Sequence, residues 1–203
     1  MNGRHLVLAI TGASGAIYGV RLCQELLRAG VRVTLLISSN GFLVLQEELA
    51  LDWRGSETEL QTSLQQYFHS HGSQLIFHGA DNLLAPVASG SSAPDGMVIC
   101  PCSMGTLARI ANGNSGNLIE RCADVMLKER RPLVLVPRET PLSDIHLENM
   151  LRLSRLGARL VPAMPAFYHQ PASVAELVGF MVGKVMDTLG IANTLYKRWG
   201  DAG

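Results

Sequence analysis

The chain has 203 residues, which is enough for one domain with a well-developed core and short for two, so we expect a single domain over residues 1–203. Hydrophobic residues make up 47% of the chain and charged residues 17%, a balance that excludes a largely disordered protein. The formal net charge is zero, which argues against binding of nucleic acid or of an anionic membrane through overall charge.

The beginning of the chain has the pattern of a strand, a helix and a second strand. Residues 5–10 form a continuous apolar run, typical of a strand buried on both faces. A glycine-rich loop at 11–15 follows, and then apolar residues recur at helical spacing over 17–27, with Gly30 where a helix-terminating glycine belongs. Residues 31–37 indicate a second buried strand, so we expect a right-handed βαβ unit.

Strands and helices continue to alternate along the rest of the chain. Ser56-x-x-Glu59 is a capping-box signature that opens a helix toward Tyr67. Further strands are expected at 74–77, 96–100, 132–136 and just before 161, and further helices at 104–111, 117–130, 143–156 and 173–189. This alternation predicts an α/β fold, with a three-layer, Rossmann-like (flavodoxin-like) parallel sheet and helices on both faces.

The four cysteines are Cys23, Cys100, Cys102 and Cys122, and their spacing does not match a zinc site. We therefore expect reduced, mostly buried thiols and no metal. The apolar run at 6–10 is too short for a signal peptide, and no run is long enough to span a membrane. These features favour the cytoplasm.

The glycine-rich loop is the first candidate binding site. Its motif, Gly12-x-x-Gly15-x-x-x-Gly19, opens a helix, where free N–H groups and the helix dipole favour an anion. The alternative is a tight turn without a ligand, but the carboxyl end of the first parallel strand favours a site. No acidic residue follows the second strand to bind a ribose hydroxyl. A mononucleotide is therefore expected, with Ser38 as a hydroxyl donor.

A second candidate lies at 100–106, where a buried strand ends and a helix begins. Ser103 has the position and side chain of a helix N-cap. The hydroxyls of Ser103 and Thr106 are equally suited to contact a cofactor, although capping alone explains Ser103. The neighbouring thiols in Cys100-Pro101-Cys102 indicate packing rather than catalysis.

Two cations, Arg121 and Lys128, lie seven residues apart on a predicted helix and therefore on one face of it. Such a pair is suited to gripping a phosphate. The alternative, which periodicity alone slightly favours, is a solvated face on which Asp124 pairs with Lys128.

Arg138 and Glu139 leave the carboxyl end of another buried strand, between two prolines. Arginine offers a fork to phosphate and glutamate can move a proton, whereas the alternative is a surface ion pair in a turn. The loop at 162–171 is proline-rich and apolar. It is suited to a pocket wall with the Tyr168 hydroxyl as a polar group, or to a plain lid or subunit contact.

Taken together, these segments resemble the UbiX family of flavin prenyltransferases over nearly the whole chain. The matching stretches are TGASGAIYG (11–19), ASGSS (88–92), MVICPCS (97–103), NLIERCADVMLKERRPLVLVPRETP (117–141) and PAFYHQP (165–171). The strings KERRPLVL, RETP and PAFYH are highly specific, whereas the glycine loop alone is not.

The resemblance implies a flavodoxin-like, Rossmann-type fold that assembles into a homododecamer with sites at subunit junctions. It implies that dimethylallyl monophosphate prenylates reduced FMN at N5 and C6 without a metal. It also implies that the prenylated FMN serves a UbiD-type decarboxylase, including one in ubiquinone biosynthesis.

Residue roles follow from the same resemblance. The family's FMN contacts fall on Gly12, Ala13, Ser14, Ser38, Ser103, Met104, Gly105, Thr106 and Arg138. Its prenyl-phosphate contacts fall on Ser89, Gly90, Arg121, Lys128, Glu139, Tyr168 and Lys184. Three residues are expected to act in catalysis: Ser14 near flavin N5, Glu48 as a second carboxylate near the site, and Glu139 as the group that takes a proton.

The chain departs from the family pattern at two positions. Lys184 stands where arginine is expected, so a planar fork becomes a point charge. Leu83 stands where some members carry a tryptophan, for which Trp199 is a possible substitute. Two other functions stay open on this fold: a flavin-dependent decarboxylase, and a non-catalytic flavin carrier.

Overall fold

The computed structural model describes residues 3–200. Its strands are β1 (His5–Ile10), β2 (Arg32–Ile37), β3 (Leu75–Gly79), β4 (Gly96–Cys102), β5 (Leu133–Pro137) and β6 (Arg159–Leu160). They form one parallel sheet in the order β3-β2-β1-β4-β5-β6. This is the doubly wound Rossmann order, in which the chain reverses its direction of travel between β1 and β4.

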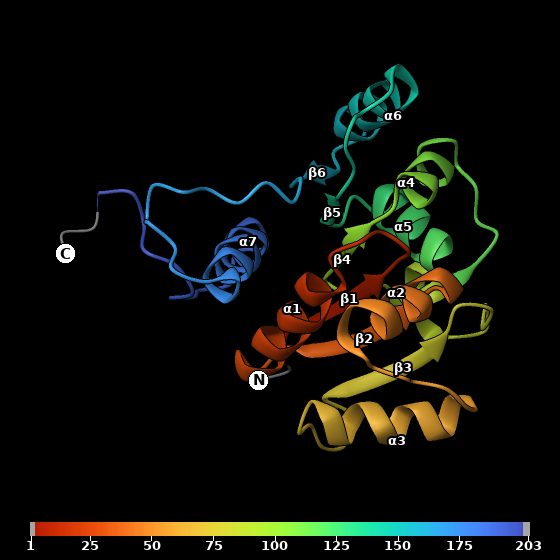
Figure 1. Ribbon diagram of the computed structural model, residues 1–203. Coiled ribbons are helices and arrows are strands. Elements are labelled where there is room, and N and C mark those ends of the chain that lie inside the picture. The colour runs from red at the N-terminus through yellow and green to blue at the C-terminus, as the bar shows by residue number, and fades with distance from the viewer. Residues whose placement is uncertain (1–2, 201–203) are drawn as a thin grey trace.

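Helices cover both faces of the sheet (Figure 1). They are α1 (Ala16–Arg28), α2 (Ser39–Leu49), α3 (Glu57–Tyr67), α4 (Met104–Ala111), α5 (Leu118–Lys128), α6 (Asp144–Arg155) and α7 (Val174–Thr188). One buried cluster joins the sheet to α1, α3 and α7, for example through Leu22, Leu64 and Val182. A second cluster joins the other face to α4, α5 and α6. The predicted three-layer α/β fold is confirmed.

The central strands are apolar on both faces because each face is covered by helices. Every residue from Leu6 to Ile10 in β1 is buried, and all of β4 is buried. Such continuous burial is the signature of parallel strands between two helix layers. No helix among residues 3–200 is long and apolar enough to cross a membrane.

Helix α2 is absent from the predicted elements. Gly41, a poor helix former, lies in its first turn, and Phe42 to Leu45 after it form an uninterrupted apolar run without helical spacing. The helix forms because Ser38 caps it, accepting a hydrogen bond from the amide of Gly41 at 3.0 Å. Two short 3₁₀ turns, Pro86–Ala88 and Gly90–Ser92, also lie outside the predicted elements.

The C-terminal part of the chain leaves the sheet. After β6 the chain runs away from α6 toward α7, which packs against α1 (Figure 1). The loop at 162–171 therefore lies largely outside the three-layer body, in a segment with little cover of its own. Phe167 is 69% exposed and Trp199 is 81% exposed, values that favour contact with another surface.

Candidate active site

Polar residues gather at the carboxyl ends of β1, β2, β4 and β5, around the point where the strand order reverses. Open α/β sheets bind ligands at this edge, in the crevice outside the strand ends. The loop after β1 is 11–15, Ser38 follows β2, Ser103 follows β4, and Arg138 follows β5. The fold thus brings together the residues that are predicted to contact FMN.

The glycine loop is shaped by close approach to α2. A Cβ atom at Gly12 would lie 2.4 Å from the Cβ atom of Asn40, so only glycine fits there. Gly15 has a φ of 101°, in the left-handed region that favours glycine. The two positions fix the loop against the neighbouring helix rather than leaving it open.

The negative charge at this loop comes from a side chain of the protein, Glu48. The carboxylate of Glu48 on α2 accepts hydrogen bonds from the amide of Gly15 at 2.9 and 3.1 Å and from the amide of Ala16 at 2.9 Å. These amides open α1, where the helix dipole favours a negative charge. The expectation that free amides here favour a ligand's anion is therefore corrected at Gly15 and Ala16, whose amides Glu48 occupies. Contact of Gly12, Ala13 and Ser14 with FMN stays a prediction.

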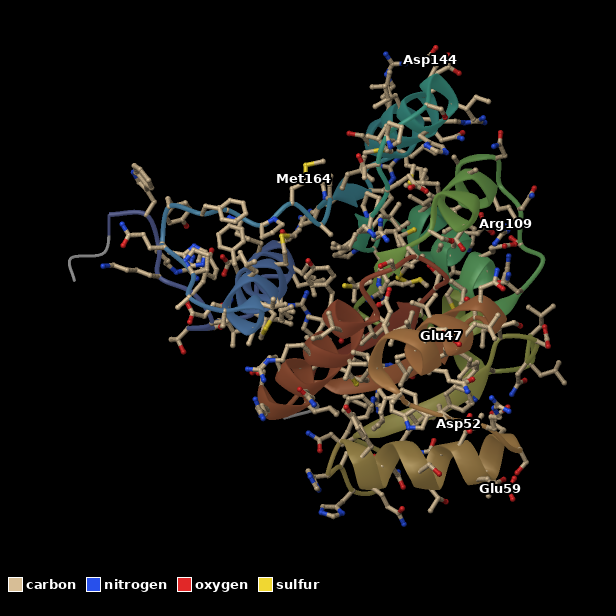
Figure 2. All side chains as sticks on the ribbon, viewed as in Figure 1. Glu47, Asp52, Glu59, Arg109, Asp144 and Met164 are labelled. Atoms are coloured by element: carbon tan, nitrogen blue, oxygen red, sulfur yellow. The ribbon has the colours of Figure 1, made fainter. Side chains whose placement is uncertain are left out.

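Replacing Glu48 by alanine should lower the free energy of unfolding by about 1 kcal/mol, as the loss of a helix N-cap does. The glutamine variant should retain most of the stability, because its amide oxygen still accepts. Chemical unfolding followed by circular dichroism measures both. Glu47 is the matched control, since it is the exposed neighbour on α2 (Figure 2). Equal losses for alanine at 47 and 48 would remove the capping role.

Thr11 connects the loops that follow β1 and β4. Its hydroxyl donates to the carbonyl oxygen of Pro101 at 2.8 Å and accepts from the amide of Ser103 at 2.8 Å. The residue is buried, so both bonds lie out of water. Sequence reasoning passed over Thr11, although a threonine that directly follows a buried strand is a signal for such a bridge.

The start of α4 carries an ordered pair of hydroxyls. Ser103 caps the helix as predicted, accepting from the amide of Thr106 at 3.3 Å, and its hydroxyl lies 3.0 Å from that of Thr106. Arg109 donates to the Thr106 hydroxyl at 3.3 Å and is itself held by the buried carboxylate of Glu120. Two neighbours thus orient the Thr106 hydroxyl at a helix N-terminus, where phosphate is favoured.

Arg138 reaches across to the glycine loop. Its Nε atom donates to the carbonyl oxygen of Ser14 at 3.0 Å, while Glu139 accepts from the amide of Thr140 at 3.0 Å. The two side chains therefore do not form the ion pair that was the alternative interpretation. Tyr18, for which the sequence predicted no role, lies near Arg138. Burial raises the pKa of its phenol, and the nearby Arg138 guanidinium opposes that shift.

An apolar cavity adjoins Arg138 and Glu139. Its volume is about 250 Å³, and its walls include Leu142, Met150 and Met164. Met164 is labelled in Figure 2, on the segment that leads away from β6. The start of the loop at 162–171 therefore does line a pocket, one that places a carboxylate beside hydrophobic walls.

A second group of predicted residues meets around α5. Arg121 donates from Nε to the carbonyl oxygen of Ala88 at 3.0 Å and pairs with Asp124 at 3.0 Å. Lys128 pairs with Glu129, and this contact holds the pKa of the Glu129 carboxyl below its usual value. The expected pairing of Asp124 with Lys128 is therefore wrong, because each cation takes a nearer carboxylate.

The loop at 88–92 packs against the end of α5. A Cβ atom at Gly90 would lie 3.0 Å from Nζ of Lys128 and 2.2 Å from a carboxylate oxygen of Glu129. The hydroxyl of Ser89 lies 2.9 Å from that of Ser91. Ser89, Gly90 and Lys128 thus lie together, whereas Arg121 stands two turns earlier on the helix.

The remaining predicted substrate residues lie elsewhere in the chain. Lys184 is exposed on α7, which packs on the opposite face of the sheet from α5. Tyr168 contacts the rings of Trp199 and Phe180 at centroid distances of 5.2 and 6.0 Å. One chain alone therefore divides the predicted phosphate-binding residues between two faces of the sheet.

All four cysteines are free and buried, as predicted. Burial raises the pKa of every one of these thiols, to about 12 for Cys102 and Cys122. A thiolate is the reactive form of cysteine, so these thiols are inert near neutral pH. Within residues 3–200 no three His, Cys, Asp or Glu side chains are grouped to hold a metal ion.

This burial predicts the response to a thiol reagent. Near pH 8 the native protein should show almost no labelling with a chromogenic disulfide, and the denatured protein should label at four sites per chain. Rapid labelling of the native protein would contradict the assignment of the thiols to packing.

Comparison with known proteins places this geometry among flavin enzymes. A model of the Flavoprotein family matches residues 1–189. The flavin prenyltransferase UbiX of Alkalihalophilus pseudofirmus is 53% identical over 196 residues, covering 97% of this chain and 96% of that protein. The crystal structure of AnUbiX (PadA1) in complex with FMN and dimethylallyl pyrophosphate superposes with a TM-score of 0.87 at 39% identity, covering 100% of both chains.

A further solved structure carries a different name. It is a dodecameric FMN-dependent UbiX-like decarboxylase from Escherichia coli O157:H7, with a TM-score of 0.83 and 40% identity, covering 96% of this chain and 98% of that one.

Proposed function

The chain belongs to the Flavoprotein family and, within it, to the UbiX flavin prenyltransferases, and on that basis we infer that it is an enzyme that transfers a prenyl group to FMN. One observation of the structure supports this inference. The predicted flavin contacts and the carboxylate of Glu139, beside an apolar cavity, lie at the same edge of the sheet. A flavin ring and a short prenyl chain need such neighbours.

We propose that the acceptor atoms are N5 and C6 of reduced FMN and that the donor is dimethylallyl monophosphate. The allylic C–O bond breaks and its electron pair leaves with the phosphate, while N5 exchanges its bond to hydrogen for a bond to the prenyl carbon. The N5 proton passes to the departing phosphate. Ring closure then replaces the C6–H bond by a C–C bond. The C6 proton is lost to a base, and the former alkene gains a proton, so the proton count is unchanged.

The residues at the sheet edge fit a bound flavin. The N-terminus of α4, with the hydroxyls of Ser103 and Thr106, would hold the phosphate together with the Arg138 fork. Glycine at position 12 lets the loop pack closely against α2, since a larger residue would clash with Asn40. Ser14 is exposed at the crest of the loop, where it would face N5, and Glu48 holds this loop in place.

Cations and apolar walls would then share the chemistry. Arg121, Lys128 and Lys184 would stabilise the departing phosphate, an electrostatic effect that can amount to several kcal/mol when it is preorganised. Tyr168 and the apolar cavity would keep water from the allylic cation. Glu139 would take the C6 proton, with the released phosphate as a possible partner base.

The division of these residues over one chain supports a site at a subunit junction. Helices α5 and α7 lie on opposite faces of the sheet, so a second chain is needed to bring Lys184 and Tyr168 toward Arg121 and Lys128. We propose a homododecamer for this reason and because the related decarboxylase is described as dodecameric. Free buried thiols support a cytoplasmic setting. A UbiD-type decarboxylase is the proposed recipient of the product.

Anaerobic incubation with reduced FMN and dimethylallyl monophosphate tests the proposal, with mass spectrometry of the flavin as the readout. We expect a mass gain of one prenyl group together with release of inorganic phosphate. No gain would overturn the transferase and favour the two other functions on this fold. Of these, the decarboxylase named among the related structures would release carbon dioxide from an added acid, and a flavin carrier would change neither compound.

The same assay with dimethylallyl diphosphate tests the donor's phosphorylation state. A related structure holds this diphosphate, so faster turnover with it would replace the monophosphate in the proposal. We expect the monophosphate to be the better donor.

A further inference from the structure

A hollow of about 600 Å³ lies at the opposite edge of the sheet from the candidate active site, where β5 and β6 begin and where α5 and α6 end. In Figure 1 β5 and β6 lie side by side, with α6 beyond them. Four arginines line the hollow: Arg130, Arg131, Arg155 and Arg159. The apolar residues of its lining include Met126 and Pro132. Neither Lys128 nor the loop at 88–92 belongs to the lining.

The arginines are not needed to cap the helices that end here. At the end of α5 the amides of Arg130 and Arg131 donate to the carbonyls of Leu127 and Met126, at 3.2 and 2.8 Å. At the end of α6 the amides of Gly157 and Ala158 make the equivalent bonds at 3.0 and 3.0 Å. Both are Schellman caps, in which backbone amides satisfy the terminal carbonyls. The guanidinium groups of Arg130 and Arg155 are therefore not needed for capping and have no carboxylate partner among residues 3–200.

The two caps differ in the residue that takes the left-handed position after the cap. Helix α6 uses Gly157, with a φ of 95°, as such a position prefers. Helix α5 uses Arg130, with a φ of 53°, although left-handed backbone costs a residue with a side chain conformational energy. Helix α3 likewise places His69 there, with a φ of 50°, so the backbone of position 130 suits glycine but does not itself assign a role to the arginine.

Little negative charge offsets this cluster. Asp95 lies 3.6 Å from Arg131, at the outer limit of an ion pair, and Arg159 donates to the carbonyl of Thr188. Among residues 3–200, no carboxylate lies within ion-pairing distance of Arg130 or Arg155. Four fixed cations thus gather in one hollow of a chain whose net charge is zero.

From this arrangement we propose that the hollow is a second anion site, and that it binds a small molecule carrying two or more linked phosphoryl groups. Guanidinium forks match phosphoryl oxygens, and several forks around one concave surface favour a multivalent anion over a single carboxylate. A volume of about 600 Å³ is in the range of small-molecule sites. The apolar lining residues, such as Met126 and Pro132, leave room for an organic group such as a nucleoside.

Calorimetric titration of inorganic tripolyphosphate into the FMN-loaded full-length protein tests the site at about 0.15 M salt. We expect saturable binding at one site per chain that weakens as salt rises. Substitution of Arg155 by alanine should weaken it about tenfold or more, because a charge-assisted contact is lost. Arg54→Ala is the matched control, since Arg54 is an exposed arginine that pairs with Asp52, and it should bind like the unmodified protein.

The variant Arg130→Gly separates ligand binding from folding. Glycine suits the left-handed position, so this variant should melt at a higher temperature and yet bind tripolyphosphate about tenfold or more weakly. Unchanged binding in Arg130→Gly would overturn the proposal. So would binding that is lost in Lys128→Ala but kept in Arg155→Ala, because the probe would then occupy the proposed substrate site.

Titration with ATP identifies the source of the phosphoryl groups. One outcome is that ATP binds more tightly than tripolyphosphate and loses that affinity in Arg155→Ala. This result would support a nucleoside polyphosphate that also contacts the apolar lining residues. Equal affinities with the same sensitivity would support recognition of the phosphoryl chain alone. Failure of both compounds to bind would overturn the site, whether or not the protein prenylates FMN.

Discussion

Replacing Glu139 by glutamine is expected to slow formation of the cyclised prenylated flavin by about 100- to 10,000-fold, the range that loss of a general base produces. Glutamine keeps the size of the side chain and its hydrogen bond from the amide of Thr140, but it cannot take a proton. FMN content should stay normal, because the flavin contacts at the glycine loop and at the start of α4 are untouched. Prenyl transfer to N5 should still occur.

Proton NMR of the extracted flavin distinguishes the two stages, because the cyclised product has lost the hydrogen at C6 and the uncyclised one retains it. Mass alone does not separate them, since the two reduced products are isomers. Glu148→Gln on α6 is the control, as an exposed carboxylate away from the sheet edge. A normal rate of C6 hydrogen loss in Glu139→Gln would remove Glu139 as the base.

Lys128→Ala is expected to lower kcat/KM for the prenyl donor by about 100-fold or more, since one fixed cation near the departing phosphate is lost. FMN content should be unchanged, because Lys128 contacts none of the predicted flavin residues. It is the last residue of α5, roughly 15 Å along that helix from its first residue, Leu118. Steady-state kinetics with varied donor, together with flavin absorbance of the purified protein, checks both parts. Loss of FMN would assign Lys128 to the flavin site instead.

Gly90→Ala provides an independent route to the same result. The added Cβ atom would meet Glu129 and Lys128 at 2.2 and 3.0 Å, so it has to displace one of the two side chains. We expect it to reproduce the defect of Lys128→Ala in part, with FMN content retained. Gly79→Ala is its control for activity, because position 79 is not left-handed and a Cβ atom there would meet only a carboxylate oxygen of Glu57, at 3.4 Å.

The sequence predicts the layers of this fold well because burial on both faces leaves a plain pattern. The apolar runs at 5–10 and 96–100 can only be strands between two helix layers, and the structure places them at the centre of the sheet. Helix α2 does not follow from the pattern, because Gly41 and the apolar run after it hide the helical period. Its existence depends on the cap at Ser38 and on close packing of Gly41 under the carbonyl of Ile10.

The candidate site, too, is predictable from the sequence only in part. Residues that come directly after strands, such as Ser103 and Arg138, are predictable because parallel strands end at one edge. Glu48 is different, since its contact with the amides of Gly15 and Ala16 joins segments 33 residues apart through a helix that was not predicted. The partners of Arg121 and Lys128 were also beyond periodicity, which gives the face of a helix but not the nearest carboxylate.

The carboxylate of Glu48 also changes where this sheet edge attracts negative charge. Because it already neutralises the positive end of α1, the positive groups that remain at this edge include the N-termini of α2 and α4 and the guanidinium of Arg138. If FMN binds here as proposed, its phosphate is expected at these groups rather than at the start of α1. A side chain that closes one helix end thereby limits where the charged end of a ligand can bind.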